Sequence, residues 1–448
     1  EIADLLKREG VKGVSPKSDG KGLQFTGAFR DSVLARLGIR PELPPGEPLD
    51  VEYMDNYRFK VGSREVEFKE EVVSGRYEFY AKLTFPSRDE AEEFARSLKA
   101  VGIDARIVGS EKVGYTVRLD SDAFFGLLAY IGATPPGLSL LYRSKEGDFR
   151  VYASTEGKRM RLYFAVKHEG VWRAAEGLYS SNYVLLQRAE RAVLEAIKDA
   201  VTKALKQLGC RAEVGEPRKV RGKKGNVEAY YLKLYDHHLA PILEHAAEDA
   251  RAKPAEVRLE GRLLVVKTGD VETAVEFKLL KRHRAEYLLA SNVEQTLALY
   301  RSLKEVGVPV KLTPRGVKVD EEAMWALVAT AIERDTPGGL SAGVMPGVEL
   351  VGVHNAGGKK MYIFRVSEEG VHYYFAVKTG EGWRAAGGKY SERDVKIAGG
   401  AVPTVAEAIN ALYREVGVER KVEVRYKNGM PYIKLTNVDL ELLGPKRQ

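Results

Sequence analysis

An internal duplication constrains the fold of this chain more than any other sequence feature. The string YFAVK at residues 163–167 is followed four residues later by WRAA, and YFAVK at residues 374–378 is followed in the same way by WRAA. Three more string pairs keep this order: VEFK at 66 and 275, RSLK at 96 and 301, and TPPGLS at 134 with TPGGLS at 336. Four matches in the same order along the chain do not arise by chance, so a segment of roughly 200 residues is duplicated.

A shorter period lies inside the duplication. Helical patterns end in a Leu-Lys-x-x-Gly type of corner, and the glycines follow one another at spacings of 92, 107, 98 and 110 residues. Glycine suits the left-handed position just past a helix end, and a basic last turn suits the helix dipole. We therefore expect a helix to end at each of Gly10, Gly102, Gly209, Gly307 and Gly417.

The segments around these corners predict a recurring unit. After a corner, a hairpin leads into an apolar helix, as at 114–119 into 123–131, 229–234 into 238–245, and 432–435 into 438–443. Asn428 and Gly429 favour a tight hairpin turn. Two strand-like runs precede each helix, such as 58–68 and 77–85. The prediction is an α+β protein of tandem αββαββα units, about four and a half copies, arranged as two pseudo-symmetric halves.

These repeats suggest the domain organisation. Residues 1–50 are expected to form a partial unit and linker, since residues 1–10 already read as a unit's second helix and four prolines fall within 41–48. Residues 51–250 form the first duplicated half and residues 251–448 the second. The missing first strands and the absence of an initial Met suggest that the parent protein extends upstream.

Composition narrows the class of protein. Cys210 is the single cysteine, which excludes disulfides within the chain and a cysteine-based zinc site. No stretch of about 18 apolar residues is present, so we expect no membrane span and a cytoplasmic location. High Glu, Lys and Arg content with few Met resembles the composition of thermophilic proteins. A net charge of +8 favours a polyanionic partner, although a merely solvated basic surface remains open.

Strand alternation supplies the first candidate binding residues. In residues 161–167 the apolar side chains fall on one face, and Arg161, Tyr163 and Lys167 fall on the other. Tyr374 and Lys378 occupy the same places in the second copy. If that face is open, its side chains suit phosphates and base edges. A plain solvated sheet face remains the alternative.

Basic clusters at predicted strand ends extend the set. Four such clusters together favour a phosphate-binding surface whose affinity falls steeply with salt, although any single one is also typical of a solubilising turn. The complete predicted nucleic-acid set is Arg159, Arg161, Tyr163, Lys167, Arg173, Arg221, Lys223, Lys224, Arg282, Arg284, Lys359, Lys360, Tyr374, Lys378 and Arg384.

The predicted unit resembles the LAGLIDADG homing-endonuclease fold, and the segment from YEFYAKLTF at 77–85 through Gly102 into VGYTV at 113–117 carries the likeness. The whole chain is also similar to the PaRep-type repeat-element proteins of hyperthermophilic crenarchaea. The first resemblance implies paired units whose sheets form a saddle in the major groove of duplex DNA. It also implies two carboxylates at helix ends that hold divalent metal.

This sequence departs from that family at the helix ends. The helix over 124–131 ends without an acid, whereas the one beginning at Met324 ends in Glu333 and Asp335, and an earlier helix ends in Glu248 and Asp249. These four acids are the candidate catalytic residues. Acids on solvated helix ends remain the alternative, and no other metal ligands or cofactor are predicted.

The sequence thus predicts a nucleic-acid-binding protein, for duplex DNA, of homing-endonuclease-like ancestry and without catalysis, acting as a monomer with internal pseudo-symmetry. Two alternatives stay open. One is a Mg²⁺-dependent DNA endonuclease active in the second half, and the other is a repeat scaffold for protein partners.

Overall fold

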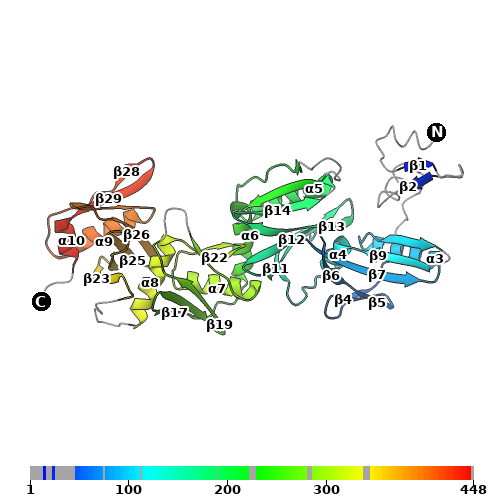
Figure 1. Cartoon of the computed structure of the whole chain (residues 1–448), viewed down its shortest axis with the longest axis horizontal. Coiled ribbons are helices and arrows are strands. Elements are labelled where there is room, and N and C mark those ends of the chain that lie inside the picture. Colours follow the sequence, from blue (N-terminus) through cyan, green and yellow to red (C-terminus); the bar gives the residue numbers. More distant parts are fainter. Residues whose placement is uncertain are drawn as a thin grey trace. The chain divides into compact units, whose positions relative to one another are not determined.

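The computed structural model describes residues 14–16, 23–25, 46–73, 76–110, 114–188, 190–220, 229–279, 285–335 and 344–444. The chain divides into two compact units. The first comprises Glu1–Ile131 with Gly170–Trp172, and the second comprises Gly132–Glu169 with Arg173–Gln448. The described part holds eight helices, and every strand pair in it is antiparallel, which confirms the α+β class (Figure 1).

Among the described residues, a strand–helix–hairpin–helix segment occurs four times, once in the first unit and three times in the second. We call these segments modules 1 to 4. Module 1 is β7 (Arg76–Phe85), α3 (Arg88–Ala100), β8 (Arg106–Ser110), β9 (Gly114–Leu119) and α4 (Ser121–Ile131). Module 2 is β14 (Tyr183–Arg188), α5 (Arg191–Gln207), β15 (Arg218–Lys219), β16 (Tyr230–Tyr235) and α6 (Asp236–Glu248).

The second half of the chain repeats them. Module 3 is β20 (Glu286–Leu288), α7 (Val293–Glu305), β21 (Lys311–Thr313), β22 (Gly316–Val319) and α8 (Glu321–Asp335). Module 4 is β27 (Asp394–Ala398), α9 (Val402–Glu415), β28 (Arg425–Lys427), β29 (Met430–Thr436) and α10 (Asn437–Leu443). In all four, the last strand lies between the other two, as in the orders β7-β9-β8 and β14-β16-β15.

Local sequence explains these boundaries. The side chain of Ser87 accepts a hydrogen bond from the Glu90 amide and caps α3, and Asn292 caps α7 in the same way. Four of the five predicted glycine corners are confirmed, because Gly102, Gly209, Gly307 and Gly417 all have φ between 74° and 81°. The fifth, Gly10, lies outside the described residues. Asn428 and Gly429 both have positive φ, as their predicted hairpin turn requires.

Antiparallel meanders separate the modules. Before module 1 come β3 (Val51–Tyr53), β4 (Arg58–Val61), β5 (Arg64–Glu67) and β6 (Lys69–Val73), and before module 2 come β10 (Ser139–Arg143), β11 (Phe149–Glu156), β12 (Arg159–His168) and β13 (Val171–Ser180). Before module 3 come β17 (Ala255–Glu260), β18 (Leu263–Thr268) and β19 (Val271–Glu276). Before module 4 come β23 (Val348–Ala356), β24 (Lys359–Val366), β25 (His372–Thr379) and β26 (Gly382–Lys389). The described N-terminal residues form β1 (Val14–Pro16) and β2 (Leu23–Phe25).

The strand count differs from the predicted unit. In the part of the chain that the structure describes, five strands lie between α4 and α5 and again between α8 and α9, where the sequence suggested two. Two seven-stranded sheets result, in the orders β10-β11-β12-β13-β14-β16-β15 and β23-β24-β25-β26-β27-β29-β28. Among the described elements, the order from β3 to α6 recurs from β17 to α10, apart from the additional β6.

In each module the helices cover one face of the sheet. Leu232 and Leu234 of β16 are buried, and both α5 and α6 contact this strand. In module 4, Ile433 and Leu435 of β29 are fully buried in a core to which α9 contributes. The strand residues that alternate with these leucines and isoleucines point away from the helices. Each module therefore has one packed face and one face without helices of its own.

Among the described helices, none is long and apolar enough to cross a membrane.

Candidate functional site

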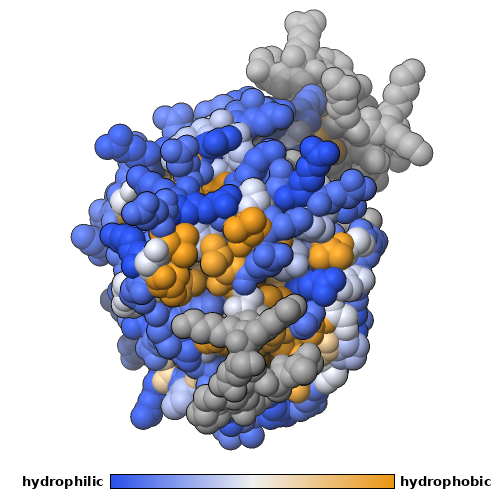
Figure 2. All heavy atoms as spheres, turned by 90° about the vertical axis from the view of Figure 1, so that its left-hand side faces the viewer, coloured by the Kyte–Doolittle hydropathy of each residue, from blue (hydrophilic) through white to orange (hydrophobic). Residues whose placement is uncertain are grey.

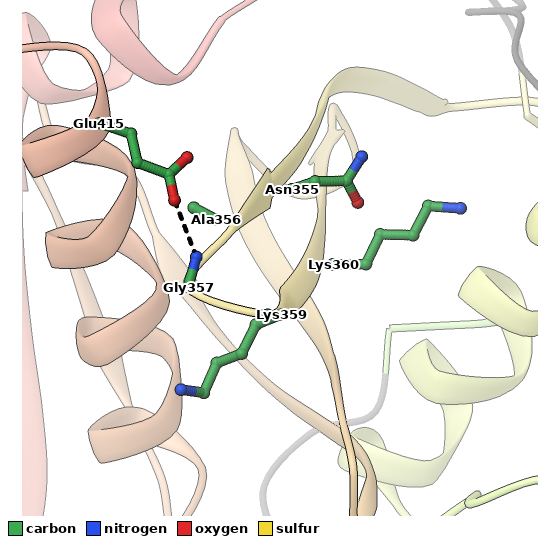
Figure 3. Close-up of a pocket in the computed structure, with 7 residues that line it drawn as sticks. Asn355, Ala356, Gly357, Lys359, Lys360 and Glu415 are labelled. Atoms are coloured by element: carbon green, nitrogen blue, oxygen red, sulfur yellow. Dashed lines mark hydrogen bonds between the residues drawn. The ribbon is translucent and has the colours of Figure 1, made fainter.

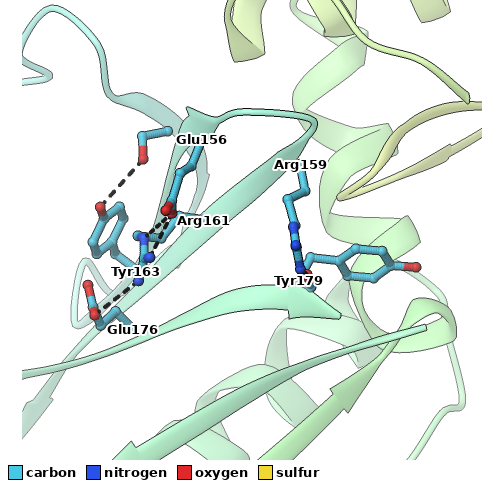
Figure 4. Close-up of polar contacts among 7 residues, drawn as sticks. Glu156, Arg159, Arg161, Tyr163, Glu176 and Tyr179 are labelled. Atoms are coloured by element: carbon cyan, nitrogen blue, oxygen red, sulfur yellow. Dashed lines mark hydrogen bonds and ion pairs between the residues drawn. The ribbon is translucent and has the colours of Figure 1, made fainter. Parts of the chain in front are cut away.

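In the first copy, the strand that supplied candidate binding residues is buried rather than open. Arg161 is 4% exposed and Tyr163 is 2% exposed. The Arg161 guanidinium lies 2.6 Å from a carboxylate oxygen of Glu156 and 3.2 Å from one of Glu176, as Figure 4 shows. The expectation of an open face is therefore wrong here, since β12 is a central strand whose buried arginine is neutralised by acids at its turn and on β13.

The second copy is covered in a different way. Helix α8 contacts β25 and β26, and the ring of Tyr374, 4% exposed, stacks on Trp325 of that helix at 4.3 Å. Burial raises the pKa of the Tyr374 phenol far above its usual value, and Glu321 adds to the increase. The Arg384 guanidinium lies 2.6 Å from a carboxylate oxygen of Glu322, also on α8. The open-face expectation is wrong for Tyr374 as well.

The candidate catalytic acid Glu333 is held by cations. Its two carboxylate oxygens accept hydrogen bonds from Lys378 at 2.6 Å and from Lys360 at 3.3 Å. Burial alone raises the pKa of this carboxyl, but the two ammonium groups outweigh it and hold the pKa below its usual value. Glu333 therefore links α8 to β24 and β25 as a salt-bridge acceptor.

The structure does not bring the other candidate acids to Glu333 as a cluster. Glu248 lies 3.3 Å from His245 one turn earlier on α6, and Asp249 is exposed just after that helix. The side chain of Asp335 lies outside the described residues. Within the described ranges there is no group of three or more His, Cys, Asp or Glu residues that could hold a metal ion.

The remaining predicted cations are mostly engaged. Lys359 lies 2.8 Å from Glu407, Arg159 donates to the carbonyl of Tyr179 at 3.1 Å, and Arg173 is half-buried near Glu190. Lys167 is exposed and makes no ion pair within the described part of the chain. The other predicted residues lie outside the described residues: Arg221, Lys223, Lys224, Arg282 and Arg284.

A hollow of about 290 Å³ opens beside the turn between β23 and β24 (Figure 3). The amide of Gly357 in this turn donates to Glu415 at 3.0 Å, and Lys359 is paired as described above. An anion entering the hollow would have to displace these carboxylates. The hollow is therefore a weak candidate site.

The face of module 1 turned away from its helices carries a different arrangement. Lys82, Arg118 and Arg106 lie directly opposite one another on the three adjacent strands β7, β9 and β8. All three side chains are exposed, and no ion pair joins any of them to an acid in the described residues. The Lys82 ammonium lies 5.3 Å from the ring centroid of Tyr80. Like charges directly opposite one another destabilise a sheet. A bound anion would reduce the repulsion among these three cations.

Every module has a cation at the equivalent central-strand position, three residues before its closing helix begins. These residues are Arg118, Lys233, Lys318 and Lys434. In module 3, Lys318 lies opposite Lys311 on one side and Tyr287 on the other, which repeats most of the module 1 row. Sequence reasoning missed these positions, although an aliphatic–basic–aliphatic triplet just before each apolar helix marks all four in the sequence.

We refer to the face of each module sheet that its own two helices leave uncovered as the open face. Those of modules 1 and 3 carry cation rows without acidic partners in the described residues, whereas four of the predicted meander cations are paired with carboxylates: Arg161, Lys359, Lys378 and Arg384. In module 4 the central-strand Lys434 lies 3.2 Å from Asp394, so its charge is partly neutralised.

Comparison with known proteins supplies no further guide to this arrangement. No protein-family description matches the chain. No curated protein and no solved structure matches it either.

Proposed function

We propose that this protein binds nucleic acid through the open faces of its module sheets. The observation that carries the proposal is the row formed by Lys82, Arg118 and Arg106, three exposed cations on adjacent strands without an acidic partner in the described residues. Phosphates along a nucleic-acid backbone can neutralise several neighbouring cations at once, and release of counterions supplies the driving force. A similar pair of cations, Lys311 and Lys318, gives a second module a surface of the same kind.

The composition supports a nucleic acid over a small anion. The chain carries a net charge of +8, and the cations form rows rather than a closed pocket. Thr84 and Thr116 lie opposite one another in the row next to Lys82 and Arg118, where hydroxyl groups can also donate to phosphate oxygens. Phosphates are common to duplexes and single strands, so the form of the nucleic acid is a separate question.

The proposal is of binding without cleavage. The carboxylate of Glu333 is engaged by two lysines, which leaves it poorly suited to hold Mg²⁺ beside a phosphate. Ancestry shared with the LAGLIDADG fold, in which an uncovered sheet face meets DNA, remains part of the proposal.

Fluorescence anisotropy with labelled oligonucleotides tests the proposal. Wild-type protein should bind with an affinity that falls steeply between about 50 and about 200 mM salt. The variant Lys82→Ala/Arg106→Ala/Arg118→Ala should bind at least about tenfold more weakly, with the slope of log affinity against log salt reduced by about 2 to 3.

A matched variant controls for net charge. Lys60→Ala/Arg88→Ala/Lys99→Ala removes the same charge from the meander sheet and helix α3 of the same unit. It should bind like wild type. Equal losses in the two variants, or no binding by wild-type protein at low salt, would overturn the proposal.

A further inference from the structure

The open face of module 2 differs in chemistry from that of module 1. Tyr231 on the central strand β16 lies directly opposite Arg218 on the edge strand β15. Lys233 follows two residues along the same strand, and therefore on the same face, about 7 Å away. Arg218 is exposed and the other two are partly exposed, whereas Leu232 between them is 1% exposed against the helices. On this face the ring of Tyr231 thus has Arg218 beside it on the neighbouring strand and Lys233 beside it along its own strand.

Module 4 repeats the arrangement. Tyr432 on β29 lies opposite Arg425 on β28, and Lys434 follows two residues along. The Lys396 ammonium lies 4.3 Å from the ring centroid of Tyr432. Figure 2 shows one face of the molecule, on which exposed hydrophobic side chains lie among hydrophilic ones.

The aromatic surface of module 2 extends beyond Tyr231. Tyr183 and Tyr235 are cross-strand neighbours with ring centroids 6.0 Å apart, and Lys233 lies 4.5 Å from the centroid of Tyr183. The ring of His237 is parallel to that of Tyr235 within 6°. Tyr235 is 36% exposed, so part of this aromatic surface is open to a ligand.

Modules 1 and 3 lack the tyrosine. The residue equivalent to Tyr231 and Tyr432, two before the central-strand cation, is Thr116 in module 1 and Gly316 in module 3. The four modules therefore alternate along the chain. At this central-strand position, modules 2 and 4 have a tyrosine flanked by cations, and modules 1 and 3 do not.

We infer that Tyr231 and Tyr432 each stack on an unpaired base, while the neighbouring Lys and Arg side chains contact the phosphates on either side of it. The ligand is then single-stranded nucleic acid, since the faces of bases in a duplex are covered by neighbouring base pairs. Aromatic rings accept any base on their π-face, and cations on a sheet beside them track the backbone. This inference rests on the proposed function and names its ligand class. It departs from the duplex expected from the sequence resemblance.

Module 2 should contribute more than module 4. Lys434 is paired with Asp394 and Arg425 lies 4.0 Å from Glu423, whereas Arg218 has no such acid among the described residues. The Lys233 ammonium lies over a tyrosine ring instead of beside a carboxylate.

Three labelled probes of about 20 nucleotides separate the contributions: an oligothymidylate, its duplex with oligoadenylate, and a strand of the same length without bases. Wild-type protein should prefer the oligothymidylate to both others at matched salt. Tyr231→Leu/Tyr432→Leu should lower affinity for the oligothymidylate roughly 5-fold or more and leave affinity for the base-free strand unchanged. Tyr231→Phe/Tyr432→Phe should retain wild-type affinity, because the ring is kept.

Tyr130→Leu/Tyr426→Leu is the matched control, since both tyrosines are exposed, at 47% and 68%, and lie away from the open faces. This variant should bind like wild type. If wild-type protein binds the base-free strand or the duplex as tightly as the oligothymidylate, the stacking inference fails while the proposed function stands. If it binds none of the three probes, the proposed function fails as well.

Discussion

The meander strands and the module sheets place basic residues on β-strands in opposite electrostatic settings. On β12, β25 and β26, the side chains of Arg161, Lys378 and Arg384 each lie 2.6 Å from a carboxylate oxygen. On β7, β9 and β8, three cations face one another without an acid in the described residues. The first arrangement connects elements of the fold, and the second leaves unneutralised charge for a ligand. Basic content alone does not separate the two; the partners of each cation do.

The largest effect is expected from Arg161→Ala. Removing this guanidinium leaves the Glu156 and Glu176 carboxylates partly buried without their partner, which should destabilise the fold by about 3 kcal/mol. Urea denaturation followed by circular dichroism should show a lower midpoint. Affinity for nucleic acid measured well below that midpoint should be unchanged. A variant of normal stability that binds nucleic acid weakly would place the binding surface on the meander instead.

Glu333→Gln tests the same comparison by removing an acid from the meander cations, so that two paired lysines become unpaired. The change frees Lys360 and Lys378, so it should cost about 1 kcal/mol of stability and raise the salt slope of nucleic-acid binding by about 1 to 2. Anisotropy titrations and thermal denaturation of the same samples measure both. If Mg²⁺-dependent cutting of supercoiled DNA is seen and this variant abolishes it, Glu333 is catalytic after all.

Arg118→Thr should raise the stability of the first unit and lower its affinity for nucleic acid. The arginine lies between Lys82 and Arg106, so its removal relieves like-charge repulsion and should stabilise the first unit by about 0.2 to 1 kcal/mol. Nucleic-acid affinity should fall at the same time. The control is Lys233→Thr, because the residue opposite Lys233 is Leu185, and no gain in stability is expected there. A loss of stability in Arg118→Thr would show that the row is not under electrostatic strain.

The smallest expected effect concerns pH. The pKa of Glu333 in the folded protein lies below its usual value near 4.5, so this carboxylate contributes stability above that pH. The contribution is lost as pH falls through the folded pKa. The stability difference between wild-type protein and Glu333→Gln should therefore be constant from neutral pH down to about 5 and shrink below about 4.5. Thermal denaturation across this range checks the prediction, and a pH-independent difference would contradict it.

Sequence reasoning succeeded where a local pattern fixes the outcome. Gly102 ends α3 in the left-handed region as predicted, and the hairpins leading into α4, α6 and α10 are where the aliphatic and turn patterns suggest. The duplication is visible in the sequence because short strings such as YFAVK recur in the same order. The candidate cations Lys223 and Arg282 lie outside the described residues, so their placement stays a prediction.

It failed where the outcome depends on which layer covers a strand. Alternation correctly separates Tyr163 from Phe164, but it carries no information on whether the polar side is solvated or buried, and both residues are buried. Tyr374 is covered by α8, which follows from tertiary packing rather than from its own strand. Arg118 was overlooked because a single basic residue between two aliphatic residues looks ordinary until the four copies are aligned by their helices.

A comparison of two triple variants tests the central claim most directly. Lys82→Ala/Arg106→Ala/Arg118→Ala removes the unpaired row, and Lys359→Ala/Lys378→Ala/Arg384→Ala removes the same charge from paired positions on the meander. Measured as the salt slope of oligonucleotide binding, the first should lose about 2 to 3 and the second less than about 1. Equal losses, or a larger loss in the meander variant, would contradict the account.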